Sequence, residues 1–320
     1  MLRSTLIYLS KAAWAREMVT KWEFARRAAA RFIAGEKLVD AIRVVRQLNQ
    51  KGINATLDHL GEHTTTPEKA DQATQDILEI LDAIHEAGVR SNVSIKLTQI
   101  GMALDEELCR ENLKHVLEKS KAYGTFIRID MEDSPWVDKT LELYRMGLEE
   151  CGCENIGVVI QSYLYRSQAD VENILAYRGR VRLCKGAYTE PADIAFPKKK
   201  DVDVNYDNIA VTLIDGAFSA GCPLISENGR IPPIPAFATH DEKRIAFAKN
   251  YAEQIRLPKQ AVEFQMLFGI RSELQESLAA EGFPVRVYVP YGSEWYPYYT
   301  RRLAERPANM WFFISNFFRR

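Results

Sequence analysis

Residues 156–187 read IGVVIQSYLYRSQADVENILAYRGRVRLCKGA; this stretch begins with a short run rich in β-branched residues and ends with a second short strand-like run that starts at Val181. Between the two runs, residues 168–177 carry apolar side chains at the spacing of an amphipathic helix. A strand, a helix and a second strand in this order predict two parallel strands joined by a right-handed crossover. The stretch therefore predicts one β–α unit of an α/β protein.

The same alternation continues in both directions along the chain. Glycine often follows the helical segments, where a left-handed residue can end a helix. The predicted strands are residues 53–58, 93–98, 126–131, 156–161, 181–187, 234–239, 262–266 and 285–290. The predicted helices between them include residues 73–87, 107–123, 137–150, 168–177, 206–220 and 242–250.

Eight such units from residue 53 to about residue 306 match the ~250 residues of a (βα)8 barrel. A doubly wound open sheet is the competing fold, but it usually carries a nucleotide-binding loop after its first strand. The sequence contains no Gly-x-Gly fingerprint and no Gly-Lys-Ser/Thr phosphate loop. We predict an α/β, TIM-type barrel over residues 46–309, with a helical extension over residues 1–45 and an aromatic tail over residues 310–320.

Composition restricts the function further. The 320 residues include 42 Lys plus Arg and 43 Asp plus Glu, so the chain lacks the concentrated positive charge that binds nucleic acid. No apolar run approaches the ~20 residues that span a bilayer. Five scattered cysteines do not suggest a disulfide framework. We expect a cytoplasmic protein, whose aromatic tail either packs on the barrel or contacts the inner face of a membrane.

Ionisable residues lie at the carboxyl ends of the predicted strands, where barrels of this type carry their active sites. Burying such groups is costly unless they are paired or used, so they predict a site. Structural ion pairs in the barrel mouth are the alternative, and Lys96→Ala separates the two: a site predicts a kinetic defect, whereas structural pairs predict a folding defect. The ionisable residues are Lys96, Asp130, Arg182, Lys185 and His240, joined at other strand ends by Asp58, Glu62, Gln161, Thr239, Gln265 and Tyr288.

The last helical segment, residues 295–305, carries two adjacent arginines. At ~100° per residue, a helix places Tyr298, Arg301, Arg302 and Glu305 on one face. Guanidinium groups bind carboxylates in a bidentate manner, so this face predicts an anion receptor above the last strand. A solvated arginine pair is the alternative interpretation.

Two further motifs are present, and we assign a function to neither. The sequence His59-Leu-Gly-Glu-His63 matches a zinc pattern, but that pattern needs one helical face and Gly61 interrupts it. Residues 198–201, Lys-Lys-Lys-Asp, are interpreted as a solvated loop. We predict no metal site.

Longer motifs resemble the proline dehydrogenase family, in particular its short monofunctional bacterial members. They are Val181-Arg-Leu-Cys-Lys-Gly-Ala-Tyr188, Ala238-Thr-His240, Glu263-Phe-Gln-Met-Leu-Phe-Gly-Ile-Arg271, Val285-Arg-Val-Tyr-Val-Pro-Tyr-Gly292 and Arg301-Arg-Leu-Ala-Glu-Arg-Pro-Ala-Asn309. The resemblance implies an FAD-dependent (βα)8 enzyme that oxidises L-proline to Δ1-pyrroline-5-carboxylate by hydride transfer to the flavin. That reaction is the first step of proline degradation to glutamate, and the family suggests a quinone as electron acceptor.

The resemblance also implies a substrate site. Arg301 and Arg302 would hold the substrate carboxylate, and Glu305 and Lys96 would orient this pair. Glu62 would be a gating partner for one of the arginines. The residues that line the proline ring would be Leu183, Tyr288 and Tyr298.

A second group of residues is implied in flavin binding and catalysis. Asp130 and Arg182 are the expected catalytic residues, with Arg182 near the reactive nitrogen of the flavin. Gln265 receives no role from the resemblance. The other expected flavin contacts are Met131, Gln161, Lys185, Gly186, Ala187, Thr239 and His240.

Two other functions remain open at this point. Another flavin barrel enzyme, such as a methylenetetrahydrofolate reductase, would share the architecture but need room for a folate. A non-catalytic carboxylate-binding protein would keep the arginine pair and lack flavin. A yellow protein that is bleached by proline and not by NADH would select proline dehydrogenase.

Overall fold

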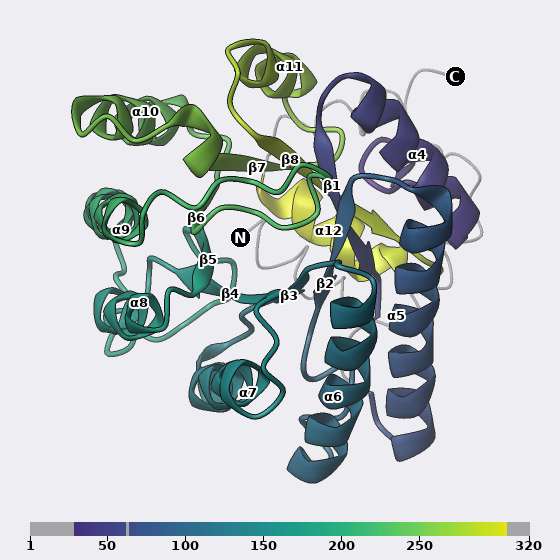
Figure 1. Ribbon diagram of the computed structural model, residues 1–320. Helices are drawn as coiled ribbons and strands as arrows, with labels where there is room; N and C mark the ends of the chain where they lie inside the picture. Colours follow the sequence, from purple (N-terminus) through teal and green to yellow (C-terminus); the bar gives the residue numbers. More distant parts are fainter. Residues whose placement is uncertain (1–28, 62–63, 306–320) are drawn as a thin grey trace, which may run out of the picture.

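A computed structural model describes residues 29–61 and 64–305, with side chains through residue 302. Eight parallel strands form a closed barrel in the order β1 to β8, which confirms the predicted TIM-type fold. In Figure 1 the helices from α5 to α11 surround the strands, and α12 lies behind them. The strands are β1 (Asn54–His59), β2 (Ser91–Ile95), β3 (Ile127–Ile129), β4 (Ile156–Gln161), β5 (Arg180–Cys184), β6 (Pro235–Ala238), β7 (Glu263–Leu267) and β8 (Val285–Tyr291).

Each predicted strand overlaps an observed one, but four observed strands end before their predicted limits. Lys96, Asp130, Lys185 and Thr239 therefore follow β2, β3, β5 and β6 directly instead of lying within them. The physical reason is local turn formation: the carbonyl of Lys96, for example, accepts a bond from the Gln99 amide at 3.1 Å. These residues consequently stand at the rim of the barrel.

The helices follow the predicted order. They are α4 (Leu38–Gln50), α5 (Pro67–Ala87), α6 (Glu106–Ala122), α7 (Val137–Glu149), α8 (Ser167–Ala176), α9 (Lys199–Ser219), α10 (Glu242–Gln254), α11 (Ser272–Ala280) and α12 (Trp295–Glu305), with short 3-10 turns at Ser134–Trp136 and Lys259–Ala261. Helix α5 begins before its predicted start because Thr66 caps it and Pro67 suits its first turn.

The interpretation of residues 198–201 as a loop is wrong. Helix α9 begins at Lys199, and this side chain pairs with Asp203 one turn later at 2.5 Å. An i,i+4 pair of this kind supports the first turn of a helix that has three lysines near its start. The polar sequence hid the helix start, because only the residues from Tyr206 onward show strong apolar periodicity.

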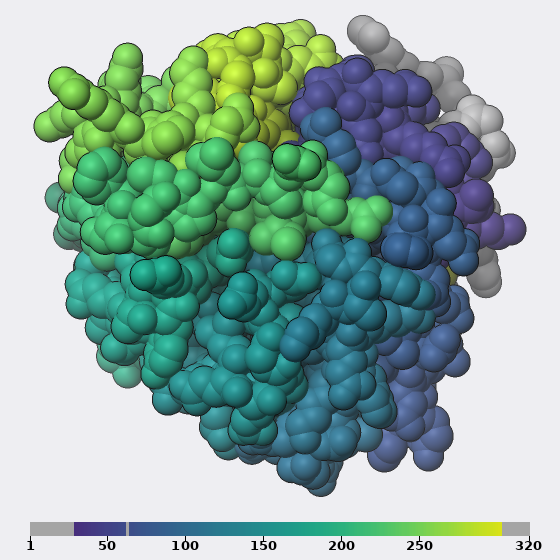
Figure 2. Space-filling view, in the orientation of Figure 1, coloured from purple at the N-terminus to yellow at the C-terminus, as the bar shows by residue number. Residues whose placement is uncertain are grey.

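The amino-terminal end of the barrel is closed by the segment that precedes β6. Arg286 donates to the Gly229 carbonyl at 2.7 Å, and Asn92 donates to the Arg230 carbonyl at 3.2 Å. In Figure 1 this green segment crosses in front of the strands, and in Figure 2 green side chains fill the same region. Ligand access is therefore expected at the opposite, carboxyl-terminal end.

The aromatic residues of α12 form a small hydrophobic cluster of their own. Trp295, Tyr296 and Tyr299 are buried against Phe32 and Ile33, apart from the main core between sheet and helices. This cluster fixes α12 across the rim that follows β8.

Several predictions fall partly or wholly outside the described residues. They concern most of the helical extension, the aromatic tail and its membrane contact. Within the described ranges, no helix is long and apolar enough to cross a membrane, and the five cysteines are free thiols.

Candidate functional site

A cavity of about 780 Å³ lies at the carboxyl ends of the strands. All eight strands or the residues that directly follow them contribute to its walls, and Tyr298, Arg301 and Arg302 from α12 complete it. Small-molecule and cofactor sites usually measure about 300–1,000 Å³. The position is the one at which TIM barrels carry their active sites.

Most of the predicted site residues meet in this cavity. Those that line it are Lys96, Asp130, Met131, Gln161, Arg182, Lys185, Gly186, Ala187, Thr239, His240, Gln265, Tyr288, Tyr298, Arg301 and Arg302. The side chains of Glu62 and Glu305 lie outside the described residues.

Leu183 is a predicted site residue that the structure does not bring to the cavity. Its neighbours Arg182 and Cys184 line the cavity, and alternation along a strand directs Leu183 to the opposite face. There it is fully buried in the core, near Tyr206 of α9, whose hydroxyl donates to the Leu183 carbonyl at 3.4 Å.

A hydrogen-bonded network crosses the floor of the cavity. Asp130 accepts bonds from Arg182 at 2.8 Å, Ser94 at 3.0 Å and the Tyr288 hydroxyl at 2.8 Å. Lys96 Nζ lies 3.5 Å from Asp130 and 3.0 Å from Asp58. One ammonium therefore stands between two buried carboxylates.

The two carboxylates have opposite pKa shifts. Burial raises the pKa of both, but at Asp130 the cations Lys96 and Arg182 outweigh burial and lower the pKa below its usual value. At Asp58 burial wins over the attraction of Lys96, and the pKa is raised. Burial would lower the pKa of Lys96, yet the neighbouring carboxylates hold it well above its usual value.

Arg182 is held by Asp130 and Ser94 on one side and by Gln265 on the other. Gln265 therefore has a positioning role in the cavity floor. Arg182 Nε donates to Gln265 Oε1 at 2.5 Å, and Gln265 in turn donates to Glu263 at 2.5 Å. Glu263 forms a fully buried ion pair with Arg286 at 2.9 Å. Gln265 thus connects the cavity floor to the buried pair below and fixes the guanidinium, whose carbon lies 5.3 Å from the ring centre of Tyr288.

The turn after β5 forms another wall. Gly186 has φ of +121°, and a Cβ at this position would lie 2.4 Å from the Tyr163 ring, so only glycine fits. The Ala187 amide donates to Gln161 Oε1 at 3.3 Å. Lys185 pairs with Asp203 at 2.5 Å and with Asp241 at 2.7 Å.

The geometry also defines the tautomer of His240. Its Nε2 accepts a bond from the Leu267 amide at 3.0 Å. An acceptor nitrogen carries no proton, so in the neutral ring the proton is on Nδ1.

Several polar and charged residues of the cavity have no role predicted from the sequence. Asp58 is predicted only as a strand-end residue, and no role is predicted for Tyr188, Lys199, Asp241 and Glu294. The sequence signal for Tyr188 is its place in the motif after β5, whereas Glu294 lies in a loop without a motif of its own. Ser94 joins the network from β2 because it precedes Lys96 by two residues and shares its face.

The cavity has an excess of positive charge. Among the described lining residues, six are Lys or Arg and four are Asp or Glu. This excess favours an anionic ligand, because low-dielectric walls strengthen the attraction between unlike charges.

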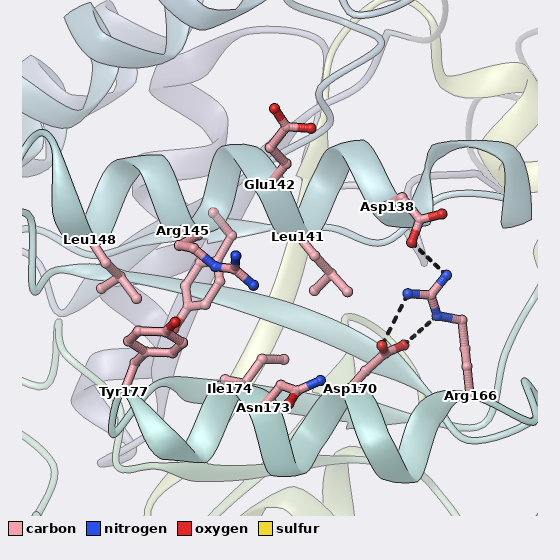
Figure 3. A pocket seen from close by; sticks show the side chains of 11 residues that line it. Asp138, Leu141, Glu142, Arg145, Leu148, Arg166, Asp170, Asn173, Ile174 and Tyr177 are labelled. Atoms are coloured by element: carbon pink, nitrogen blue, oxygen red, sulfur yellow. Dashed lines mark hydrogen bonds and ion pairs between the residues drawn. The ribbon is translucent and has the colours of Figure 1, made fainter.

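A second cavity, of about 520 Å³, lies between α7 and α8 (Figure 3). Three of its charged groups pair with one another, since Arg166 contacts both Asp138 and Asp170 at 2.7 Å. Its other walls include Leu141 and Tyr177. Because it lies on the outside of the barrel, away from the strand ends, we do not assign it to catalysis.

The zinc-like pattern begins at the end of a strand and not on a helix. His59 ends β1, stacks on Tyr291 and lies 3.2 Å from Asp76, while His63 is outside the described residues. Among the residues that the structure describes, no group of His, Cys, Asp and Glu is arranged to hold a metal.

Comparison with known proteins shows one consistent family. A family model described as proline dehydrogenase matches residues 41–314. The chain is 42% identical to proline dehydrogenase of Deinococcus radiodurans over 90% of this chain and 89% of that one. It is 39% identical to proline dehydrogenase 1 of Bacillus subtilis over 98% of each chain.

A solved structure agrees with these sequence matches. Proline utilization A from Bdellovibrio bacteriovorus, inactivated by N-propargylglycine, superposes with a TM-score of 0.79 at 25% identity. The match covers 88% of this chain and 33% of that longer chain.

Proposed function

Because this chain belongs to the proline dehydrogenase family, we propose that it oxidises L-proline to Δ1-pyrroline-5-carboxylate with a bound FAD. The coarser assignment, an oxidoreductase of proline catabolism, follows from the family itself. The observation that carries the finer proposal is one cavity that joins the Arg301–Arg302 pair to the Lys96–Asp130–Arg182 network.

The chemistry of the cavity fits a flavin. Met131, Val159 and Ala238 offer apolar surface for a planar ring, and the Gln161 side chain can both donate and accept hydrogen bonds at a ring edge. Lys185 and Lys199 supply positive charge for a diphosphate. We propose Asp130, Met131, Gln161, Arg182, Lys185, Gly186, Ala187, Thr239 and His240 as the residues that hold FAD.

When bound, FAD would supply the hydride acceptor, so the chain has to bind, orient and tune it. Arg182 is the residue suited to tuning, because Asp130, Ser94 and Gln265 fix its guanidinium. A fixed cation beside the flavin stabilises a negative charge that develops there.

The substrate would be oriented by the groups opposite the strand ends. Arg301 and Arg302 are adjacent on α12 and suit the planar carboxylate of an amino acid. Tyr288 and Tyr298 offer ring faces for the pyrrolidine carbons. Lys96 adds a third cation, and Glu305 and Glu62 remain proposed partners of the arginines. Holding the reacting carbon in one geometry is a large catalytic term in a hydride transfer.

The test is the visible spectrum of the purified protein during anaerobic titration with L-proline. We expect a yellow protein whose flavin bands are bleached by proline and not by NADH. A colourless protein would favour a carboxylate-binding function, and bleaching by NADH alone would favour a reductase.

We also propose a cytoplasmic location, with a quinone as acceptor and peripheral contact with the membrane through the tail. Reduction of a soluble quinone by the proline-reduced protein tests the acceptor.

A further inference from the structure

Oxidation of proline at ring carbon C5 requires a proton acceptor. At neutral pH the ring nitrogen is an ammonium, and its lone pair is available for the new C=N bond only after a proton has left. An alkylammonium with a pKa near 10.4, the reference value for Lys, is deprotonated in roughly one molecule per thousand at pH 7.4. An enzyme that works at neutral pH gains a large factor by supplying the base.

We propose that Asp58 is the base that accepts the proton of the ring ammonium. In this step the N–H bond breaks, an O–H bond forms on the Asp58 carboxylate, and the electron pair stays on the nitrogen. The inference rests on the proposed function, because it concerns the same substrate in the same cavity.

The position of Asp58 supports this role. Its carboxylate ends the inward face of β1, is 2% exposed and lines the same cavity as Arg301 and Arg302. In proline the ammonium and the carboxylate are on one carbon, so a carboxylate held by the arginines brings the ammonium into the cavity that Asp58 lines. A buried ammonium needs an anionic or hydrogen-bonding partner there.

The other charged groups of the cavity floor are less suited to accept a proton. Asp130 already accepts from Ser94, Arg182 and Tyr288, and its pKa is lowered by Lys96 and Arg182 against the effect of burial. Lys96 is held in its protonated form, since its neighbouring carboxylates raise its pKa well above the usual value despite burial. Burial and two carboxylates likewise raise the pKa of the Tyr288 hydroxyl.

Asp58 differs from Asp130 in the number of donors around its carboxylate and in the direction of its pKa shift. Its Oδ1 accepts a bond from Lys96 at 3.0 Å and its carboxylate also interacts with the Tyr288 hydroxyl, but burial outweighs both and raises its pKa. Two like groups whose pKa values are driven apart by their surroundings are the usual arrangement of an acid–base site. The charged or titratable groups that face Asp58 are Lys96 after β2, Asp130 after β3, and Tyr288 and Tyr291 on β8.

Two other carboxylates, Asp241 and Glu294, line the cavity. Asp241 is paired with Lys185 at 2.7 Å, and its pKa is lowered because Lys185 outweighs burial. Glu294 lies in the loop before α12 and is the matched alternative base.

The test is the pH dependence of kcat/KM for flavin reduction by L-proline. Wild type should lose activity below the raised pKa of Asp58 and then stay level up to about pH 10, since a base in the protein removes the need for free amine. Asp58→Asn should bind flavin with an unchanged visible spectrum. Its kcat/KM should be lower on the order of a thousandfold at pH 7.4 and should rise about tenfold per pH unit toward the pKa of the amine.

Three controls make the result decisive. Glu294→Gln should keep the level region. The ring-ether analogue tetrahydrofuran-2-carboxylate has no proton to transfer, so Asp58→Asn should bind it within about threefold of wild type. If Asp58→Asn does not fold, wild type and Glu294→Gln still test the proposal, because a tenfold rise per pH unit between pH 7 and 10 in wild type would exclude any enzymic base.

A level profile in Asp58→Asn, or a steep one in Glu294→Gln, would overturn the assignment of Asp58. Bleaching of wild type by proline would still support the proposed function in either case, so the two hypotheses fail separately.

Discussion

Arg301 and Arg302 are the residues on which the substrate assignment depends most directly. Removing one of a pair of charge-assisted hydrogen-bond donors costs about 1.5–3 kcal/mol. We therefore expect Arg301→Met and Arg302→Met each to raise the KM for proline about ten- to hundredfold, with the flavin retained. Steady-state kinetics and the absorbance ratio of flavin to protein provide the measurement. Unchanged proline kinetics in both variants would remove the pair from the site.

Cys184 provides a prediction about reactivity in the same cavity. Burial raises the pKa of its thiol to about 12, so at pH 8 only about one molecule in ten thousand carries the nucleophilic thiolate. We expect Cys184 to react with iodoacetamide at pH 8 at least a thousandfold more slowly than free glutathione. Peptide mass spectrometry at timed intervals gives the rate. Labelling at the rate of glutathione would show that the surroundings of this half-buried thiol do not raise its pKa.

At the level of single elements, α12 combines an anchoring face with a functional one. Tyr299 is buried beside Trp295 and Phe32, whereas Arg301 and Arg302 face the cavity. Truncation of a buried aromatic residue costs about 3–5 kcal/mol, and here the loss falls on a small cluster separate from the main core.

We therefore expect Tyr299→Ala to raise the KM for proline about tenfold or more while the barrel still melts within a few degrees of wild type. Differential scanning calorimetry and kinetics on the same preparation test this. Tyr177→Ala, which removes an exposed ring directly after α8 on the outside of the barrel, is the matched control and should change neither value. A large fall in melting temperature without a change in KM would mean that α12 is part of the main folding unit.

The elements also show what the sequence could predict. The eight strands were predictable because β-branched runs alternate with helical periodicity, and the bounds 156–161 and the start at Val285 were correct. The start of α9 was not, because Lys199 and Asp203 stabilise it by charge rather than by an apolar face. The orientation of Leu183 follows from strand alternation, but the resemblance placed it among substrate contacts.

The same limit applies within the cavity. A strand-end position showed that Asp58 and Asp130 lie at one rim, yet their opposite pKa shifts depend on which donors surround each carboxylate. Those donors come from β2, β5 and β8, so only the closed barrel brings them together. The role of Gln265 was likewise invisible in sequence, because its partners Arg182 and Glu263 lie on two strands.

On the scale of the whole molecule, the barrel interior is held by charges as well as by apolar packing. Arg286 and Glu263 are fully buried and form a bidentate pair, with distances of 2.9 and 3.0 Å. Arg286 also donates to the carbonyls of Ala55 and Gly229, so it ties β8 to β1 and to the segment that closes the barrel. Removing one partner of a buried pair usually costs about 3–5 kcal/mol, since the other charge remains without compensation.

Glu263→Gln should therefore lower the melting temperature by about 6–20 °C, at the rate of about 2–4 °C per kcal/mol that holds for domains of about 150–250 residues. The expected effect also reaches the cavity, because Gln265 connects Glu263 to Arg182, so flavin affinity should fall with stability. The matched control is Glu276→Gln, which breaks the exposed pair with Lys51 and should stay within about 0.5 kcal/mol of wild type. Calorimetry and flavin titration of the two variants measure both effects. Equal stability of the two variants would mean that the apolar layers alone hold the barrel closed, and that the buried pair serves only to position Arg182.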